Sequence, residues 1–207
     1  MQDANDGYEY DVFVSYRSGF LDAAETIPLP TRTWTREVFA PELRRWLAAE
    51  VGASRVFVER DEIQPGAQWP EDLAEKLLRS KVLISVLDAT YCDSLWCMAE
   101  LRSMVERERV LGCGPGGEQA LVIPIRFADR HRFPEEIKTR SLIDFGNYAS
   151  LDPRLSGSAV YRELVEQVRQ LCGRLQPRID APPQWDPSWP IVRSQPHDRP
   201  PFALPEL

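Results

Sequence analysis

The chain has 207 residues, 43% of them hydrophobic and 28% charged, which is an ordinary composition for a folded domain with a sizeable core. Its net charge of −7 and its pI of about 5.0 argue against bulk electrostatic binding to nucleic acid or to an anionic membrane. There is no run of about 18 apolar residues that could span a membrane, and the polar, acidic N-terminus lacks the features of a signal peptide, so we expect a cytoplasmic protein without a membrane or nucleic-acid partner.

Five short apolar runs recur along the first three quarters of the chain and predict strands. They are YDVFVSY (10–16), RVFV (55–58), KVLISVL (81–87), ALVIPIRF (120–127) and SLIDF (141–145). Three of the runs are nearly continuous in Val, Ile, Leu and Phe, as strands covered on both faces are.

Helical periodicity lies between the apolar runs. The predicted helices are residues 34–50, which Pro41 interrupts or restarts, a helix that Pro70 opens, residues 94–110 and residues 158–175. Strands that alternate with helices favour a parallel sheet. We therefore predict an α/β fold: a flavodoxin-like five-stranded parallel sheet in the order 2-1-3-4-5, with helices on both faces.

The last part of the chain has a different composition. Residues 177–207 contain nine of the eighteen prolines, which is typical of a disordered tail. Trp185 and Trp189 argue against a free tail, because large aromatic side chains are usually buried. We predict one domain over residues 1–176 and a C-terminal extension over 177–207 that packs on it.

Ligands of open α/β sheets bind beyond the carboxyl ends of the strands, at the switch point in strand order. In the predicted order this crevice lies between the first and third strands. The first strand ends at Ser15-Tyr16-Arg17, and the loop after the third strand leads directly into the helix that carries Trp96 and Glu100. We therefore expect Glu100 in the second turn of a helix that begins at the rim of the crevice.

The position of Glu100 on that helix is unusual for a carboxylate. A helical wheel places Cys97, Leu101, Met104 and Val105 in the buried stripe, with Trp96 and Glu100 at its border. No basic residue lies three or four positions away to form a surface ion pair. We expect a partly hydrated carboxylate that faces a ligand, since a lone buried carboxylate is costly.

Other motifs give weaker indications of a site. GCGPGG (112–117) matches a dinucleotide-binding pattern in spacing, but it follows a helix and precedes a strand, so we interpret it as a loop. Asp88 stands where a receiver domain has its phosphoacceptor, but the further acids that would bind Mg²⁺ are missing after the first strand. His131 and His197 do not provide a credible partner for a Ser or Cys nucleophile.

The four cysteines do not indicate a metal site. Cys92, Cys97, Cys113 and Cys172 form no C-x-x-C pair, and a structural zinc site needs four clustered ligands. We predict buried or inert thiols and no bound metal.

Several stretches together resemble a TIR (Toll/interleukin-1 receptor) domain. YDVFVSYRS (10–18) is similar to the first-strand motif of that family, and residues 56–101 are similar to its second strand, BB loop, third strand and W-x-x-x-E region. VIPIRF (122–127) and the following FP (133–134) resemble its fourth strand and loop. The similarity covers roughly residues 8–175 and is greatest to bacterial TIR proteins, several of which act in antiphage defence.

The resemblance implies two alternative functions. Many bacterial and plant TIR domains cleave NAD⁺ with a glutamate in the helix after the third strand, and the matching residue here is Glu100, with Trp96 as the matching tryptophan. Animal adaptor TIR domains are scaffolds, many of which lack that glutamate. The resemblance therefore favours an NAD⁺ glycohydrolase or cyclase, with a non-enzymatic interaction module as the alternative.

The same resemblance suggests further site residues and partners. NAD⁺ would be a substrate, and no other cofactor is expected. Tyr16 and Trp96 would supply aromatic surface for a base, Arg17 would pair with the pyrophosphate, and Asp61 in the BB loop would lie near the substrate. The Ser18–Thr33 connection, with its two prolines, departs from the family pattern and would lie over the site.

The BB loop (59–69) implies assembly. Its Pro65-Gly66 turn and Ile63 would form a surface for self-association with a second copy. A separate sensor or effector protein is a further possible partner. The sequence predicts neither the trigger nor whether the product is linear or cyclic.

Overall fold

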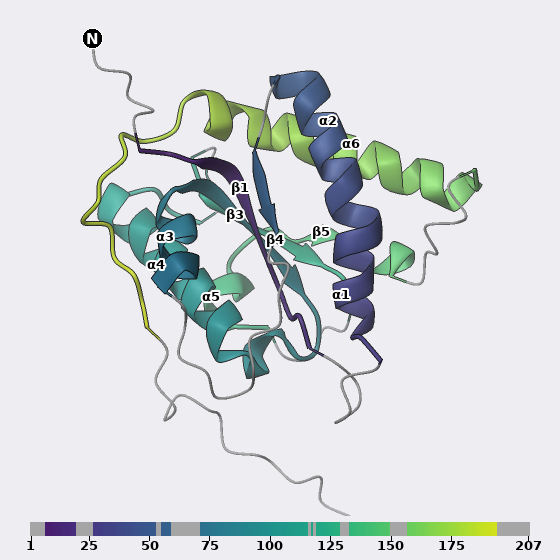
Figure 1. Cartoon of the computed structure of the whole chain (residues 1–207), viewed down its shortest axis with the longest axis horizontal. Helices are drawn as coiled ribbons and strands as arrows, with labels where there is room; N and C mark the ends of the chain where they lie inside the picture. The colour runs from purple at the N-terminus through teal and green to yellow at the C-terminus, as the bar shows by residue number, and fades with distance from the viewer. Residues whose placement is uncertain are drawn as a thin grey trace, which may run out of the picture.

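The computed structural model describes residues 7–19, 27–52, 55–58, 71–115, 117, 119–128, 133–149 and 157–193. A parallel sheet of five strands forms its centre (Figure 1). The strands are β1 (Tyr10–Tyr16), β2 (Val56–Val58), β3 (Ser80–Leu87), β4 (Val122–Arg126) and β5 (Ile143–Asp144). Their order is β2-β1-β3-β4-β5, which confirms the predicted flavodoxin-like topology.

Helices cover both faces of the sheet (Figure 1). One face is covered by α1 (Pro30–Trp34), the π-helical turn η1 (Thr35–Phe39), α2 (Ala40–Val51) and α6 (Ala159–Asp180). The other face is covered by α3 (Glu71–Leu78), α4 (Leu95–Leu111) and α5 (Glu135–Lys138). Two short 3-10 turns, η2 (Tyr91–Asp93) and η3 (Gly146–Tyr148), complete the described elements.

Strand alternation divides the apolar side chains between two cores. In β1, Val12, Val14 and Tyr16 point into the core under α1, α2 and α6, while Phe13 points into the core under α3 and α4. β3 is buried along its whole length and contributes to both cores in the same way. This explains why its sequence is nearly continuous in apolar residues.

Pro41 does not break the first helix. The described backbone stays helical from Pro30 to Val51, and the π-helical turn η1 lies just before the proline. In this turn the N–H of Ala40 donates to the carbonyl of Thr35, five residues back. Because Pro41 has no N–H and its ring crowds the preceding turn, a wider turn at this place accommodates it without a break. The expected interruption is therefore a local widening of the helix.

The last helix is longer than predicted. α6 runs to Asp180 and contains Pro177, so the predicted boundary at 176 falls inside it. Residues 181–193, which we call the C-terminal strap, then pass beside α3 and α4 (Figure 1). The N–H of Val192 donates to Ser103 Oγ (2.8 Å), and Trp185 Nε1 donates to the carbonyl of Leu78 (3.2 Å).

Trp189 anchors the strap on a buried arginine. Its side chain is only 5% exposed, and the guanidinium of Arg107 lies 4.2 Å from its ring centroid. Arg107, on α4, donates to the carbonyls of Leu77 (3.1 Å) and Ser80 (2.8 Å) where α3 ends and β3 begins. The strap therefore covers a cation that fastens α4 to the end of α3.

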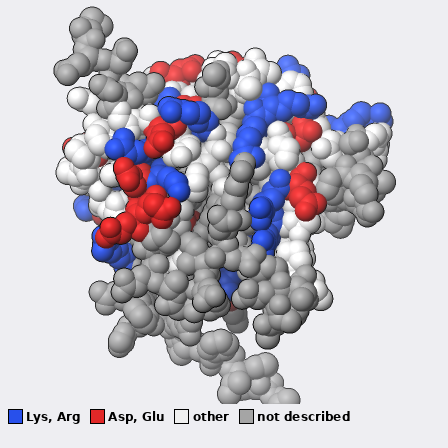
Figure 2. Space-filling view, in the orientation of Figure 1, with Lys and Arg blue, Asp and Glu red and all other residues white. Residues whose placement is uncertain are grey.

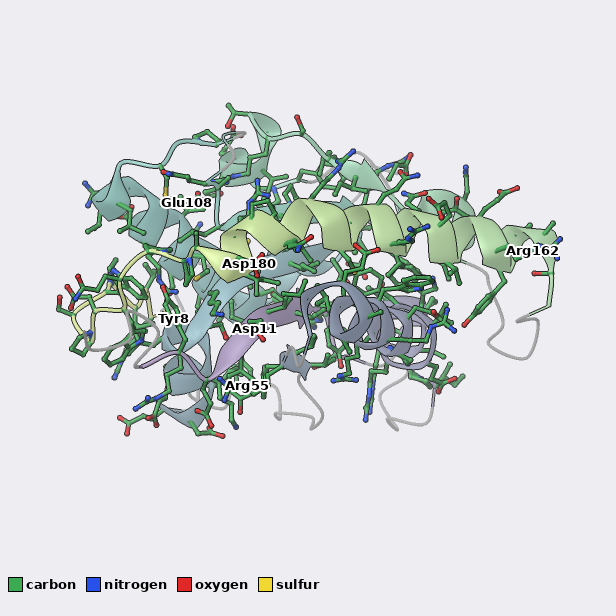
Figure 3. All side chains as sticks on the ribbon, turned by 90° about the horizontal axis from the view of Figure 1, so that it is seen from above. Tyr8, Asp11, Arg55, Glu108, Arg162 and Asp180 are labelled. Carbon is green, nitrogen blue, oxygen red and sulfur yellow. The ribbon has the colours of Figure 1, made fainter. Side chains whose placement is uncertain are left out.

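The N-terminal segment lies against the same strap. Tyr8 donates from its hydroxyl to the carbonyl of Pro183 (3.0 Å), and Figure 3 shows Tyr8 beside the yellow strap. Gly7 has a φ of 141°, and a side chain there would run into the ring of Trp185. The segment just before β1 and the strap thus pack together at the end of the sheet where the parallel strands begin.

The surface has a mixed charge. On the face shown in Figure 2, acidic and basic side chains lie next to one another over the helices. No helix in the described part of the chain is long and apolar enough to cross a membrane.

Candidate functional site

The elements that meet at the switch point are joined through Tyr91, which sequence reasoning did not single out. Tyr91 lies in η2, between β3 and α4, and is fully buried. Its hydroxyl is 2.8 Å from Ser15 Oγ at the end of β1, and it donates to the carbonyl of Cys97 (3.2 Å) in the first turn of α4. The end of β1 and the start of α4 are therefore joined through one phenol.

Glu100 lies one turn further along α4, as predicted, but it is not partly hydrated. Its exposed fraction is 2%, so the expectation of a wet carboxylate at the border of a cleft is wrong. The buried arc of α4 is wider than the predicted stripe because α4 is covered from several sides. The sheet packs on one side, the strap reaches it at Ser103, and Arg102 pairs with Glu136 of α5.

The first turn of α4 is well ordered by local hydrogen bonds. Ser94 is its N-cap residue, and its hydroxyl accepts a hydrogen bond from the N–H of Cys97 (3.3 Å). Glu100 lies close enough to Tyr91 to disfavour ionisation of the Tyr91 phenol. Burial, followed by the neighbouring Cys97 and Glu100, raises the pKa of Tyr91 well above its usual range, so its phenol keeps the proton that it donates.

Asp88 joins the end of β3 to the start of α1. Its carboxylate is 7% exposed and accepts hydrogen bonds from the Thr31 hydroxyl and from the N–H (2.8 Å) and hydroxyl (2.9 Å) of Thr90. These bonds satisfy a buried charge that would otherwise be costly. Asp88 thus has a structural role here, since it fixes the end of the Ser18–Thr33 connection beside the crevice.

Sequence-predicted aromatic residues lie on opposite faces of the sheet. Trp96 is half-buried and packs on the core under α3 and α4, on the side of Glu100. Tyr16 is buried in the core under α1, α2 and α6. The structure therefore does not bring Tyr16 and Trp96 together, because Tyr16 shares the face of Val12 and Val14.

Arg17 lies at the end of β1 and is half-buried. Its guanidinium lies close to Gly19, whose carbonyl accepts a hydrogen bond from the N–H of Leu29 (3.0 Å). This bond brings the two ends of the long connection together at the crevice. The pairing of Arg17 with a pyrophosphate stays a prediction.

The BB-loop residues lie outside the described part of the chain. These are Asp61, which was predicted near the substrate, and Ile63, Pro65 and Gly66, which were predicted at an assembly surface. Their predicted roles stay predictions.

Cys172 and two open hollows lie away from Glu100. Burial raises the pKa of Cys172 to about 12, so its thiol is a poor nucleophile at neutral pH. Two surface hollows lie along the β4–β5 edge and α6, where Ile143 and Arg174 line both. In the described residues, no group of three His, Cys, Asp or Glu side chains could bind a metal ion.

The strand order and the helices on both faces of the sheet define a flavodoxin-like α/β domain. The helix that carries Glu100 begins at the switch point of this sheet. The TIR domain family model matches residues 33–155, more than half of the chain, and the chain therefore belongs to the TIR domain family. The match begins after β1, so the first-strand motif lies outside it.

Two solved structures show similarity to the chain. The TIR domain of the Toll-related receptor TRR-2 from Hydra magnipapillata is 17% identical, with a TM-score of 0.44, over 78% of this chain and 99% of that one. The TIR domains of the activated Roq1 resistosome, which directly recognises the pathogen effector XopQ, are 20% identical, with a TM-score of 0.39, over 84% of this chain and 86% of that one. Membership of the family rests on the sequence match.

Proposed function

We propose that this TIR domain cleaves the nicotinamide–ribose bond of NAD⁺, in the cytoplasm and as part of antiphage defence. The observation that carries the proposal is the place of Glu100, a 2% exposed carboxylate in the second turn of the helix that starts at the switch point. A buried carboxylate is costly, so one that a protein keeps beside the switch point of its sheet is a candidate for a functional role. The resemblance to bacterial TIR proteins supports the biological setting.

A single carboxylate suffices for this reaction. Nicotinamide in NAD⁺ is a cationic leaving group, so the bonding electrons return to its ring nitrogen and no acid has to protonate it. The ribose that remains carries positive charge at the anomeric carbon, as in glycoside cleavage. Glu100 would stabilise that charge. Water then adds to give ADP-ribose and a proton, or the adenine adds to give a cyclic isomer.

Self-association is the proposed way to open the site. With Glu100 buried in the single chain, the substrate can reach it only after a local movement, and binding of a second copy would favour the open state. The acidic BB loop would form this contact. The number of open sites would then rise faster than linearly with protein concentration.

The decisive experiment incubates the purified protein with NAD⁺ over a wide range of protein concentrations. Nicotinamide release that rises faster than linearly would support an assembly-gated enzyme, and the second product would distinguish ADP-ribose from a cyclic isomer. If no nicotinamide appears at any concentration, the assay is repeated in lysate from phage-infected cells. Continued absence of release there would refute the proposed activity.

Substitution at the BB loop tests the assembly step. We expect Gly66→Arg or Ile63→Asp to lower activity about tenfold or more at concentrations where the wild type associates, because a charge or bulk at an interface core opposes docking. Analytical ultracentrifugation should show a matching loss of self-association. Val110→Asp, at an exposed position on α4, is the control. Unchanged association and activity in both loop variants would contradict the role of this loop.

An interaction module without enzymatic activity is the second candidate. It is favoured by one observation, namely that Glu100 is only 2% exposed in the single chain, so that its carboxylate does not face a substrate there. Such a module would self-associate in the same way but release no nicotinamide under any condition.

A further inference from the structure

The hydrogen bonds around Tyr91 have a defined direction. A carbonyl can only accept, so the single phenolic proton of Tyr91 goes to the carbonyl of Cys97. The contact between Tyr91 and Ser15 must then have Ser15 Oγ as its donor. A directed chain of two hydrogen bonds therefore runs from the end of β1, through the phenol, to the first turn of α4.

These two hydrogen bonds end close to the proposed catalytic carboxylate of Glu100. Cys97 and Glu100 are three residues apart on α4, so they lie on neighbouring positions of the same side of the helix. Both backbone polar groups of Cys97 are hydrogen-bonded to side chains: its N–H donates to the hydroxyl of Ser94, and its carbonyl accepts from the hydroxyl of Tyr91. The turn that presents Glu100 is thus fixed relative to β1 and not only relative to its own helix.

We propose that Tyr91 is a positioning residue for Glu100: with Ser15 as its donor, it fixes the first turn of α4 against the end of β1, and so sets where the carboxylate meets the ribose of NAD⁺. This inference rests on the proposed function. A carboxylate that stabilises a developing charge must lie within a fraction of an ångström of its place, and neighbouring hydrogen bonds provide that accuracy. Tyr91 itself does not contact the reacting atoms in this assignment.

The same geometry explains why a tyrosine is needed. Phenylalanine would fill nearly the same volume, but it would leave the carbonyl of Cys97 and the hydroxyl of Ser15 without this buried partner. Because Asp88 and Thr31 join other elements, they would not replace the lost link between β1 and α4.

The test compares Tyr91→Phe and Ser15→Ala with Tyr161→Phe. Tyr161, on α6, also loses one hydrogen bond on this change, to Glu42 Oε1 (3.1 Å), but it lies on the other face of the sheet. We expect Tyr91→Phe to lower kcat about tenfold or more with KM within about twofold, and Ser15→Ala to act in the same direction. Tyr161→Phe should leave both constants unchanged.

A second measurement keeps this inference separate from the proposed activity. Amide hydrogen exchange over residues 97–101 should accelerate in Tyr91→Phe and not in Tyr161→Phe, whether or not the wild type cleaves NAD⁺. A wild type that releases no nicotinamide even in lysate from phage-infected cells, but shows this exchange pattern, would refute the NAD⁺ chemistry and support the fixed turn. Unchanged exchange, or an unchanged kcat in an active enzyme, would overturn the role of Tyr91.

Discussion

Replacing Glu100 by glutamine should lower the rate of nicotinamide release by about 10²–10³-fold, the loss typical of removing one preorganised electrostatic group. Glutamine has nearly the same shape, so the change removes the charge and leaves the volume of the buried side chain. A positive charge on the ribose would then develop without its neighbouring anion. The measurement is a progress curve of nicotinamide by chromatography at a protein concentration where the wild type is active.

The matched control is Glu106→Gln on the same helix. Glu106 is partly exposed and pairs at the surface with Arg109 (2.7 Å). Its replacement removes the same charge from α4 as Glu100→Gln does, with little effect on the free energy of unfolding. Full activity in Glu106→Gln together with loss in Glu100→Gln would separate the local charge from the net charge of the helix. If Glu100→Gln stays folded, associates normally and still turns over at the wild-type rate, Glu100 is not the catalytic group.

The strands of the sheet could be predicted because their apolar runs indicate burial on both faces. β3 is buried on both faces, and such a strand needs the unbroken apolar sequence that KVLISVL shows. Alternation with helical segments then leaves few topologies for a parallel sheet. The start of α4 was also predictable, since Ser94 is a common type of N-cap residue and does cap it.

The burial of Glu100 could not be predicted from its helix alone. A helical wheel describes one stripe that faces one partner, whereas α4 contacts the sheet, α5 and the strap. Tyr16 and Trp96 were expected to share one site, although strand alternation alone would have been sufficient to separate them. A period of two puts Tyr16 on the face of Val12 and Val14, away from the helix that carries Glu100.

Contacts between distant parts of the chain had no local signal. Tyr91 stands in a short irregular loop, and its partners on β1 and α4 become visible only when the sheet is assembled. Trp189 was expected to pack somewhere on the domain, but nothing in the sequence identified Arg107 as its partner. Tyr91, Trp189 and Arg107 all have polar or amphipathic side chains, and whether such side chains are buried depends on the tertiary structure.

The largest stability effect is expected at this Trp189–Arg107 contact. Trp189→Ala should lower the free energy of unfolding by about 3–5 kcal/mol, the usual range for removing a buried large aromatic side chain. It also uncovers a cation, since burial lowers the pKa of Arg107 only to about 10 and the group stays charged at neutral pH. Guanidinium denaturation of the full chain measures the change. Trp189→Phe, which keeps a ring over Arg107, should cost less.

A double-mutant cycle shows whether the ring and the cation act together. Arg107→Lys keeps the charge but loses the flat guanidinium that faces the indole 4.2 Å away, and Trp189→Leu keeps an apolar side chain without the ring. A desolvated cation–π pair predicts a coupling free energy of about 1–2 kcal/mol between the two changes. Additive effects within about 0.5 kcal/mol would instead mean that Trp189 acts through buried area alone. Since the strap also reaches Ser103 one turn beyond Glu100, a coupled result would further predict faster amide exchange along the middle of α4 in Trp189→Leu.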